Sequence, residues 1–373
     1  MRTGLLGGIA LLGTLAVAAC GGSSNATTPT PASGTPAAAA TGNPTSAVTL
    51  HESGSSLLYP FLEELVAPLT QAYSNITLAP APGGSGKGIS DAIAGATSFG
   101  GSDAYLSPGQ ASQNATLENI PIAVSAQAVN YNLPGITNLK LSGGVLAKIY
   151  KGTITKWNDS AIAALNPGVT LPATGIIPVR RLDGSGDTFI FTSLLSATDP
   201  SWSSGPGFGT TINWPAVSSE QSAMGNPAMV ATCSKSQNVG CVAYIGVSAE
   251  ASALSAGLGE AELQNQAGNF VTPTQTAIEA AVAAAAGSTP ANLRQSLIYS
   301  NGAQAYPIVN FEYIIVNTTQ TDANTALAIR TFLSWAIDPN GGSQSQFLQK
   351  EDFVGLPSSV IPKVQAAIAA IKG

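Results

Sequence analysis

Three segments of the chain repeat one order of elements: a short β-rich run, a loop with glycine and serine, and an amphipathic helical pattern. The β-rich runs span residues 48–50, 76–78 and 176–179, and the loops that follow span 52–57, 83–88 and 180–188. After the first loop, apolar residues recur every three or four positions, at Leu58, Leu62, Leu65 and Leu69. Alternating strands and helices are typical of α/β domains. We therefore expect an α/β fold in which each glycine-rich loop leads into a helix.

Length and charge limit the function classes. About 325 residues follow the N-terminal region, which is enough for two lobes that each bury a core. The chain has 14 Lys and Arg against 20 Asp and Glu, a net charge of −6, so nothing favours binding to nucleic acid. Only 9% of residues are charged, far below the roughly 25% of ordinary domains. A charged residue inside a motif is therefore informative.

The N-terminal residues have the pattern of a lipoprotein signal peptide. Arg2 precedes an apolar run that ends at Val17-Ala18-Ala19-Cys20, and small residues are what a signal peptidase requires before its cleavage site. We predict a signal peptide at 1–19 and a diacylglycerol on Cys20. An N-terminal membrane helix is the alternative, but the run is glycine-rich, short for a span and followed by a neutral stretch.

Residues 20–47 are predicted to be the lipidated cysteine and a flexible tether. Residues 21–47 contain no charged and no aromatic side chain, so they lack what is needed to build a core. We therefore expect the protein on the extracytoplasmic face of the cell membrane, held there by its lipid.

Two cysteines remain once Cys20 carries lipid, and they are Cys233 and Cys241. Outside the cytoplasm we expect them to form a disulfide, which closes a short loop and contributes about 2 to 3 kcal/mol. Two thiolate metal ligands are the alternative. Because the chain has no further free cysteine and a single histidine, we expect no metal site.

The three glycine-rich loops place serine hydroxyls and main-chain amides where a helix begins. Unpaired N–H groups and the helix dipole make such positions binding sites for anions, and glycine lets the backbone approach a ligand closely. For any single loop, a turn with a serine cap is the simpler interpretation. Three such loops together with an arginine motif favour an anion site.

A nucleotide site is disfavoured. Residues 84–87 resemble part of a P-loop, but Ala81 stands where the first glycine is required. Gly88 stands where a Ser or Thr would bind magnesium. We therefore reject this interpretation.

A serine hydrolase is disfavoured as well. Its nucleophile would need the pattern Gly-x-Ser-x-Gly, and Lys87 and Asp187 occupy the second glycine position after Ser85 and Ser185. The single histidine, His51, lies beside the first loop, where a solvated residue at a strand end is a simpler interpretation than a general base.

Four motifs together resemble the phosphate-binding proteins of bacterial phosphate-specific ABC importers. They are GSSL at 54–57, GSG at 84–86, GSDA at 101–104 and RLDGSGDTF at 181–189. The Arg-x-Asp-Gly-Ser-Gly segment is the most specific of them. The resemblance runs from about residue 48 to the C-terminus and includes 149–159, 165–168 and 240–246.

The resemblance implies a set of site residues by position. Ser56 would contribute its hydroxyl and Leu57 its amide, Asp103 would accept a phosphate proton, and Arg181 would supply the charged donor, held by Asp183. The implied phosphate-binding residues are Ser56, Leu57, Ser85, Asp103, Arg181, Ser185, Gly186 and Asp187, supported by Asp183 and Thr188.

The sequence departs from a common family pattern at two positions. Leu57 stands where Phe is frequent, which matters little for a contact through the backbone. Asp187 stands where Thr is frequent, so a hydroxyl donor becomes a carboxylate. Whether Asp187 contacts the ligand is left open by the sequence.

The fold implied by the resemblance is the type II periplasmic-binding-protein fold, with two α/β lobes joined by two hinge strands and the ligand cleft between them. We place the crossings near Val124 and Ala305. Lobe 1 is then 48–124 plus 305–373, and lobe 2 is 125–304. Two crossings permit closure of the lobes over a ligand.

The implied function is high-affinity binding of inorganic phosphate and its delivery to the transmembrane permease subunits of an ABC importer. We expect no enzymatic activity, no cofactor, and a monomer. Two alternatives stay open. A binder of another tetrahedral oxyanion such as sulfate would have no use for the Asp103 carboxylate, and a secreted phosphoester hydrolase would need a metal cluster or an activated nucleophile.

Overall fold

The computed structural model describes residues 40–373. The predicted signal peptide (1–19), the lipidated Cys20 and residues 20–39 of the predicted tether lie outside the described residues. Part of the remaining tether is anchored: Gly42 N donates to Thr331 Oγ1 at 2.9 Å, and Thr45 N donates to Asn324 Oδ1 at 3.1 Å. Both acceptors lie on α11 (Ala323–Ala336).

A nine-stranded sheet runs through the described part of the chain. Its order is β2 (Ile76–Ala79), β1 (Val48–Gly54), β3 (Phe99–Ser102), β12 (Val309–Asn317), β4 (Leu117–Tyr131), β8 (Cys241–Gly246), β6 (Ile177–Arg181) and β7 (Gln221–Ala223), with β9 (Gly259–Glu260) also paired to β4. A small second sheet contains β11 (Phe270–Val271), β10 (Glu262–Gln264) and β5 (Lys140–Leu141). The α/β fold class is confirmed.

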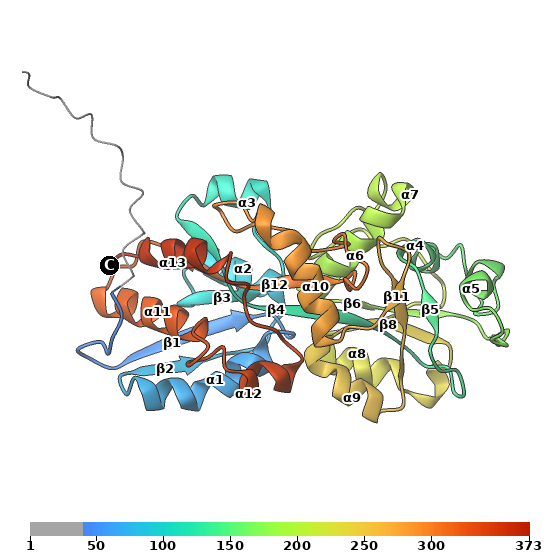
Figure 1. Cartoon of the computed structure of the whole chain (residues 1–373), viewed down its shortest axis with the longest axis horizontal. Helices are drawn as coiled ribbons and strands as arrows, with labels where there is room; N and C mark the ends of the chain where they lie inside the picture. Colours follow the sequence, from blue (N-terminus) through green and yellow to red (C-terminus); the bar gives the residue numbers. More distant parts are fainter. Residues whose placement is uncertain (1–39) are drawn as a thin grey trace, which may run out of the picture. The chain divides into compact units, whose positions relative to one another are not determined.

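Strand β4 joins two halves of the large sheet (Figure 1). Residues 117–126 of β4 pair antiparallel with β12, and residues 127–131 pair antiparallel with β8. We call β2, β1, β3 and β12 the β1 half, and β8, β6 and β7 the β8 half. Val124, near which we place a crossing between lobes, lies in the middle of β4.

Helices cover both halves. Those packed on the β1 half include α1 (Tyr59–Ala72), α2 (Ser85–Ala94) and α11, and α13 (Ile361–Ala369) packs against α11 and β4. The β8 half carries α4 (Gly143–Tyr150), α6 (Gly186–Thr198), α7 (Pro200–Ser203) and α8 (Gly225–Cys233), and α10 (Gln275–Ala285) lies against β4 and β12. The remaining helices are α3 (Pro108–Gln113), α5 (Ser160–Leu165), α9 (Glu250–Ser255) and α12 (Ser345–Leu348).

The predicted apolar faces form the core. Phe61, Leu62, Leu65 and Leu69 of α1 are fully buried, and each such side chain contributes about 1.5 to 3 kcal/mol to folding. On α2, Ile89 is buried, whereas Ile93 is 40% exposed near the C-terminal end of the helix.

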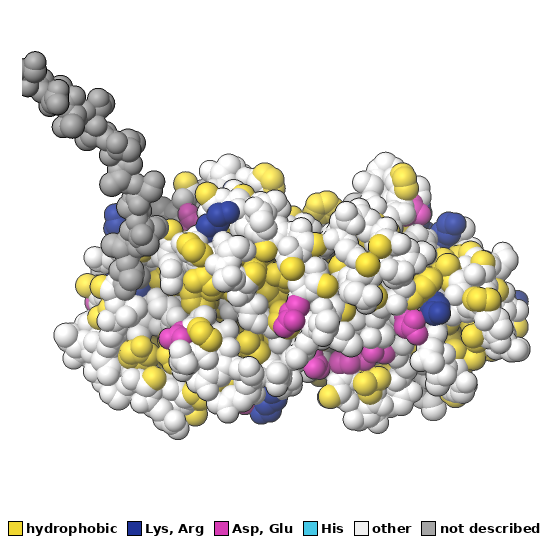
Figure 2. Space-filling view, viewed as in Figure 1, with side chains coloured by type: hydrophobic (Ala, Val, Ile, Leu, Met, Phe, Trp, Pro, Cys, Tyr) yellow, Lys and Arg dark blue, Asp and Glu magenta, His cyan; other side chains and the backbone are white. Residues whose placement is uncertain are grey.

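Cys233 at the end of α8 and Cys241 at the start of β8 form the expected disulfide. On the face drawn in Figure 2, charged side chains are sparse, as the composition leads one to expect, and several acidic ones lie near one another around the middle of the face. No helix within residues 40–373 is both long enough and apolar enough to cross a membrane.

Candidate functional site

The three glycine-rich loops meet in space. Gly83 N and Gly84 N both donate to Gly54 O, at 2.8 and 2.7 Å, which fixes the second loop against the first. Gly86 N donates to Gly184 O at 2.8 Å, which joins the second loop to the third. The third loop belongs to the β8 half, so this bond links the two halves of the sheet.

The first loop leads from β1 to α1 through four buried or half-buried residues, 55–58. The hydroxyl of Ser55 donates to Asp103 Oδ1 and accepts from the N–H groups of Leu57 and Leu58 at 3.0 and 3.1 Å. The predicted backbone donor of Leu57 is therefore used by Ser55 in this structure. Ser56 Oγ accepts from Asn226 N at 3.3 Å, across from the β8 half.

Ser85 and Asp103 are brought together at the start of α2. Gly84 precedes this helix with φ of 84°, and a methyl group there would collide with Asp183 and Gly184. Ser85 is fully buried, and its hydroxyl accepts from Asp103 N at 3.1 Å. Only glycine at position 84 allows the second loop to lie this close to the third loop.

Arg181 is held between two carboxylates. Its Nε donates to Asp183 Oδ1 at 2.8 Å, its Nη2 to Asp183 Oδ2, and its Nη1 to Asp187 Oδ2. Burial acts against the guanidinium charge, but the two carboxylates prevail and raise the pKa of Arg181. Although burial also opposes the Asp183 charge, the hydrogen bonds from Arg181 lower the pKa of Asp183. Arg181 is therefore a permanent, oriented cation in a site with little solvent.

The Asp187 carboxylate accepts hydrogen bonds from three different side chains. Besides the bond from Arg181, Asp187 Oδ2 accepts from Asn226 Nδ2 at 3.0 Å and Oδ1 accepts from Gln127 Nε2 at 3.1 Å. Burial raises the pKa of Asp187, and the neighbouring Arg181 and amide donors oppose that rise. Three donors from three elements converge on this one group.

The start of α6 faces the start of α2. Ser185 caps α6 by accepting from Thr188 N at 3.3 Å, while Thr188 Oγ1 bonds with Tyr244 OH at 2.9 Å. A methyl group on Gly186 would collide with Asp103 Oδ2 and Ser85 Oγ. The positive ends of two helix dipoles therefore point toward one small region beside Asp103.

The comparisons with known proteins decide the family. Residues 27–340 match the model of the PBP superfamily domain. The phosphate-binding protein PstS of Pasteurella multocida is 35% identical over 286 residues, which cover 76% of this chain and 79% of the relative. Phosphate-binding protein PstS 2 of Mycobacterium tuberculosis is 30% identical over 99% of both chains. The chain belongs to the PstS family.

A solved structure shares the fold at lower sequence identity. The phosphate-binding protein of Stenotrophomonas maltophilia superposes with a TM-score of 0.61 at 20% identity, covering 87% of this chain and 94% of that structure. The expected type II periplasmic-binding-protein fold is thereby confirmed.

Sequence reasoning missed several residues that bond with the predicted site residues, among them Ser55, Gln127, Asn226 and Tyr244. Ser55 was passed over although it lies in the first motif, because the resemblance points to its neighbour Ser56. Gln127 is a polar residue inside a buried apolar strand, and that signal could have found it. Asn226 follows a glycine with φ of 74° at the start of α8 and belongs to no motif.

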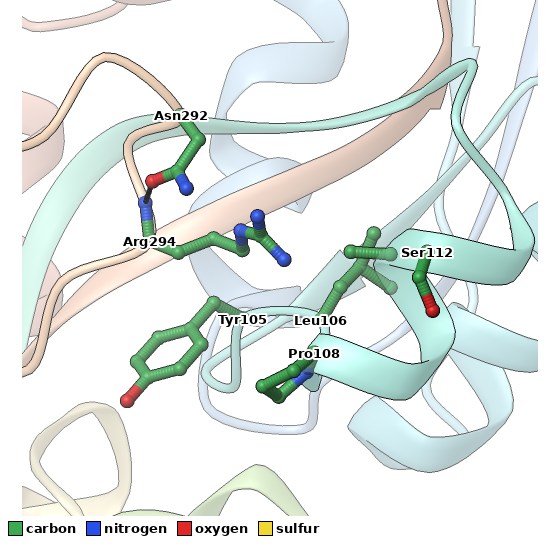
Figure 3. Close-up of a pocket in the computed structure, with 7 residues that line it drawn as sticks. Tyr105, Leu106, Pro108, Ser112, Asn292 and Arg294 are labelled. Carbon is green, nitrogen blue, oxygen red and sulfur yellow. Dashed lines mark hydrogen bonds between the residues drawn. The ribbon is translucent and has the colours of Figure 1, made fainter.

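The described residues line several surface depressions. One of about 340 Å³ is lined by Ser56, Gly84, Asp183 and Met224, so it opens beside the meeting point of the loops. Another of about 460 Å³ contains none of the predicted site residues (Figure 3). There the half-buried Arg294 guanidinium points toward Leu106 and Ser112.

Proposed function

We propose that this chain binds inorganic phosphate outside the cytoplasmic membrane and delivers it to an ABC permease. The observation that carries the proposal is the approach of Gly186, at the start of α6, to Ser85 and Asp103, at the start of α2. Two helix N-termini, a buried arginine and a carboxylate that can accept a hydrogen bond are what a protonated oxyanion requires. The PstS relatives support phosphate as that oxyanion.

The mechanism is binding without bond making or breaking. Phosphate enters between the two halves, and their approach surrounds it with N–H and O–H donors that replace its water. The phosphate-binding residues we propose are Ser56, Leu57, Ser85, Asp103, Arg181, Ser185, Gly186 and Asp187. The net charge of −6 does not prevent this, because exposed carboxylates further away are screened over about 8 to 10 Å.

The two predicted lobes remain part of the proposal. The proposed crossing at Val124 falls inside β4, and Ala305 lies four residues before β12. These two adjacent antiparallel strands are the connections that a hinge between lobes 48–124 plus 305–373 and 125–304 would use.

Membrane attachment through a lipid on Cys20, after removal of 1–19, completes the proposal. The protein would act there as a monomer beside the transmembrane permease subunits. In cells, the Cys20→Ser variant should appear in the soluble fraction and still bind phosphate. Retention of this variant in the membrane fraction would contradict the anchor.

Calorimetric titration of the purified, phosphate-free chain with phosphate, arsenate and sulfate tests the function. We expect tight binding of phosphate, binding of arsenate, which carries protons in the same way, and exclusion of sulfate. Equal affinity for sulfate would instead favour a general oxyanion binder, and no heat with any of the three would contradict the proposal.

A further inference from the structure

A second buried carboxyl group lies beside Asp103. β3 and β12 pair antiparallel with Ser102 opposite Tyr313, so the next positions in this register are Asp103 and Glu312. Side chains at opposite positions of an antiparallel pair lie on the same side and close together. The two carboxyl groups are within hydrogen-bonding reach, and both residues are buried, Glu312 completely.

The two oxygens of Glu312 have different surroundings. Oε1 accepts from Ser125 Oγ on β4 and from Asn310 Nδ2 at 3.0 Å. Oε2 is buried and has no hydrogen-bond partner among the described residues. Asn310 Nδ2 also lies 3.5 Å from the main-chain oxygen of Asp103, which keeps the two residues together. A proton held between the carboxyl groups of Glu312 and Asp103 would satisfy the buried oxygen.

The surrounding charges favour such a shared proton. Burial raises the pKa of Glu312 to about 7, and burial together with the charges of Glu312 and Asp187 raises the pKa of Asp103. Two carboxyl groups so close titrate as a pair. The groups that act on this pair are Ser55 after β1, Ser125 on β4, Asn310 and Tyr313 on β12, and Asp187 on α6, itself paired with Arg181.

We infer that Glu312 is the proton partner of Asp103: the pair shares one proton, and phosphate binding places that proton on Glu312. This inference rests on the proposed function. The O–H bond on Asp103 breaks, an O–H bond forms on Glu312, and no proton is gained or lost by the pair. Asp103 is then an unprotonated acceptor for a phosphate hydroxyl, and Glu312 donates to Asp103 from behind without touching the ligand.

The inference predicts a specific dependence on pH. Once the pair has lost its proton, two adjacent carboxylates repel an incoming anion. Phosphate binding must then take up a proton, and affinity falls by about tenfold per pH unit from this cause. Glu312 is thus a positioning residue that sets the pH range in which Asp103 can discriminate between oxyanions.

Glu312→Gln is the decisive variant. The amide oxygen can accept from Ser125 and Asn310 as Oε1 does, and the amide nitrogen can donate permanently to Asp103 in place of the proton. Calorimetry from pH 6 to 9 should give an affinity comparable to that of the wild type at pH 6. Above pH 7 the ratio of variant to wild-type affinity should rise toward about tenfold per pH unit. Phosphate and Asp187 ionise in both proteins. Their effects on affinity therefore cancel in the ratio of variant to wild-type affinity.

Ser125→Ala is a second, smaller change on the same network. Without Ser125, ionised Glu312 loses a hydrogen-bond donor, so the pair should hold its proton to higher pH. The decline of phosphate affinity at alkaline pH should therefore begin at higher pH. This variant tests the role of Glu312 if Glu312→Gln does not fold. If the wild type binds phosphate and the folded variants show the same dependence of affinity on pH, the proposed role of Glu312 is wrong. Absence of phosphate binding by the wild type at every pH overturns the proposed function instead.

Discussion

The main-chain N–H of Gly86 donates to the carbonyl oxygen of Gly184 at 2.8 Å. Gly86 is in the first turn of α2, and Gly184 lies just before α6. The bond therefore joins the two helix starts that belong to different halves of the sheet. The glycines approach so closely that a methyl group on Gly86 would lie 3.1 Å from both Cα and O of Gly184.

Gly86→Ala should weaken phosphate binding without weakening the fold. The distance from the added methyl group to Gly184 is shorter than an ordinary van der Waals contact. The substitution should therefore lengthen the hydrogen bond between the two loops and oppose their approach. We expect about fivefold lower affinity, equivalent to the loss of roughly 1 kcal/mol from one hydrogen bond. Alanine is the better helix former by up to about 1 kcal/mol, so urea denaturation should show equal or higher stability.

Gly109→Ala is the matched control for Gly86→Ala. Gly109 also lies in the first turn of a helix, α3, and a methyl group there meets nothing within 4 Å. We expect the stability gain alone, with phosphate affinity unchanged. Equal affinities of the two variants would show that the contact between the loops does not contribute to binding.

Arg181→Lys should keep the positive charge and lose the planar fork of donors. The fork bonds with both Asp183 and Asp187, and a lysine ammonium cannot hold both carboxylates while also contacting a ligand. Loss of one charged hydrogen bond costs about 1.5 to 3 kcal/mol, so we expect phosphate affinity to fall roughly tenfold to hundredfold. Calorimetry at pH 7 measures this directly.

The same substitution at the preceding residue, Arg180, provides a control. Arg180 pairs with Glu220 at 2.9 Å, and both side chains are partly exposed. Arg180→Lys should therefore leave phosphate affinity unchanged, since exposed ion pairs contribute about 1 kcal/mol or less. If Arg180→Lys weakened binding as much as Arg181→Lys, the assignment of the charged donor would be wrong.

Much of the fold could be predicted because local pattern and tertiary structure agree. The β-rich runs at 48–50, 76–78 and 176–179 lie in or overlap β1, β2 and β6, and each loop leads into a helix as expected. β4 was harder, since its fifteen residues are buried on both faces and contain Ser125, Gln127 and Asn130. Such a strand lacks the alternation of polar and apolar residues that reveals a half-buried strand.

The site was predictable only where glycine loops mark it. Ser85, Asp103, Arg181 and Asp187 belong to motifs, and the structure bonds Ser85 to Asp103 and Arg181 to Asp187. Asn226 bonds with Asp187, and Glu312 lies within hydrogen-bonding reach of Asp103, although both come from segments far away in the sequence. No local pattern predicts such partners, because they are placed by strand pairing and by the packing of α8 rather than by their neighbours in the chain.

Glu250→Gln should stabilise the protein at alkaline pH. Burial raises the pKa of Glu250 from 4.5 to about 8. The contribution of this group to stability is therefore fully present below pH 4.5 and is lost as pH rises through 8. A glutamine avoids the buried charge and offers an N–H to Asn130 Oδ1, which has no partner among residues 40–373.

We expect a gain of about 1 to 3 kcal/mol at pH 8 and little change at pH 4.5, measured by urea denaturation without phosphate. Glu279→Gln is the control, because Glu279 is exposed on α10 and its replacement should change neither value. A gain at pH 8 no larger than at pH 4.5 would mean that Glu250 is not the group that titrates.

Asp187→Thr should change which form of phosphate binds best. In the wild type, the Asp187 carboxylate accepts hydrogen bonds from Arg181, Asn226 and Gln127. If Asp187 also faces the ligand, it needs a hydrogen bond from a second phosphate proton, so monobasic phosphate is preferred and affinity is higher below pH 7.

The threonine hydroxyl can donate to an unprotonated oxygen, so Asp187→Thr should shift the best binding toward alkaline pH and admit sulfate more readily. Asp187→Asn serves as the comparison of equal shape, because it removes the charge, keeps one oxygen as an acceptor for Arg181 and replaces the other oxygen with an N–H donor. Phosphate and sulfate titrations from pH 5 to 8 measure both effects. An unchanged pH profile in Asp187→Thr, with sulfate still excluded, would place this carboxylate outside the ligand site and leave it the single role of holding Arg181 in place.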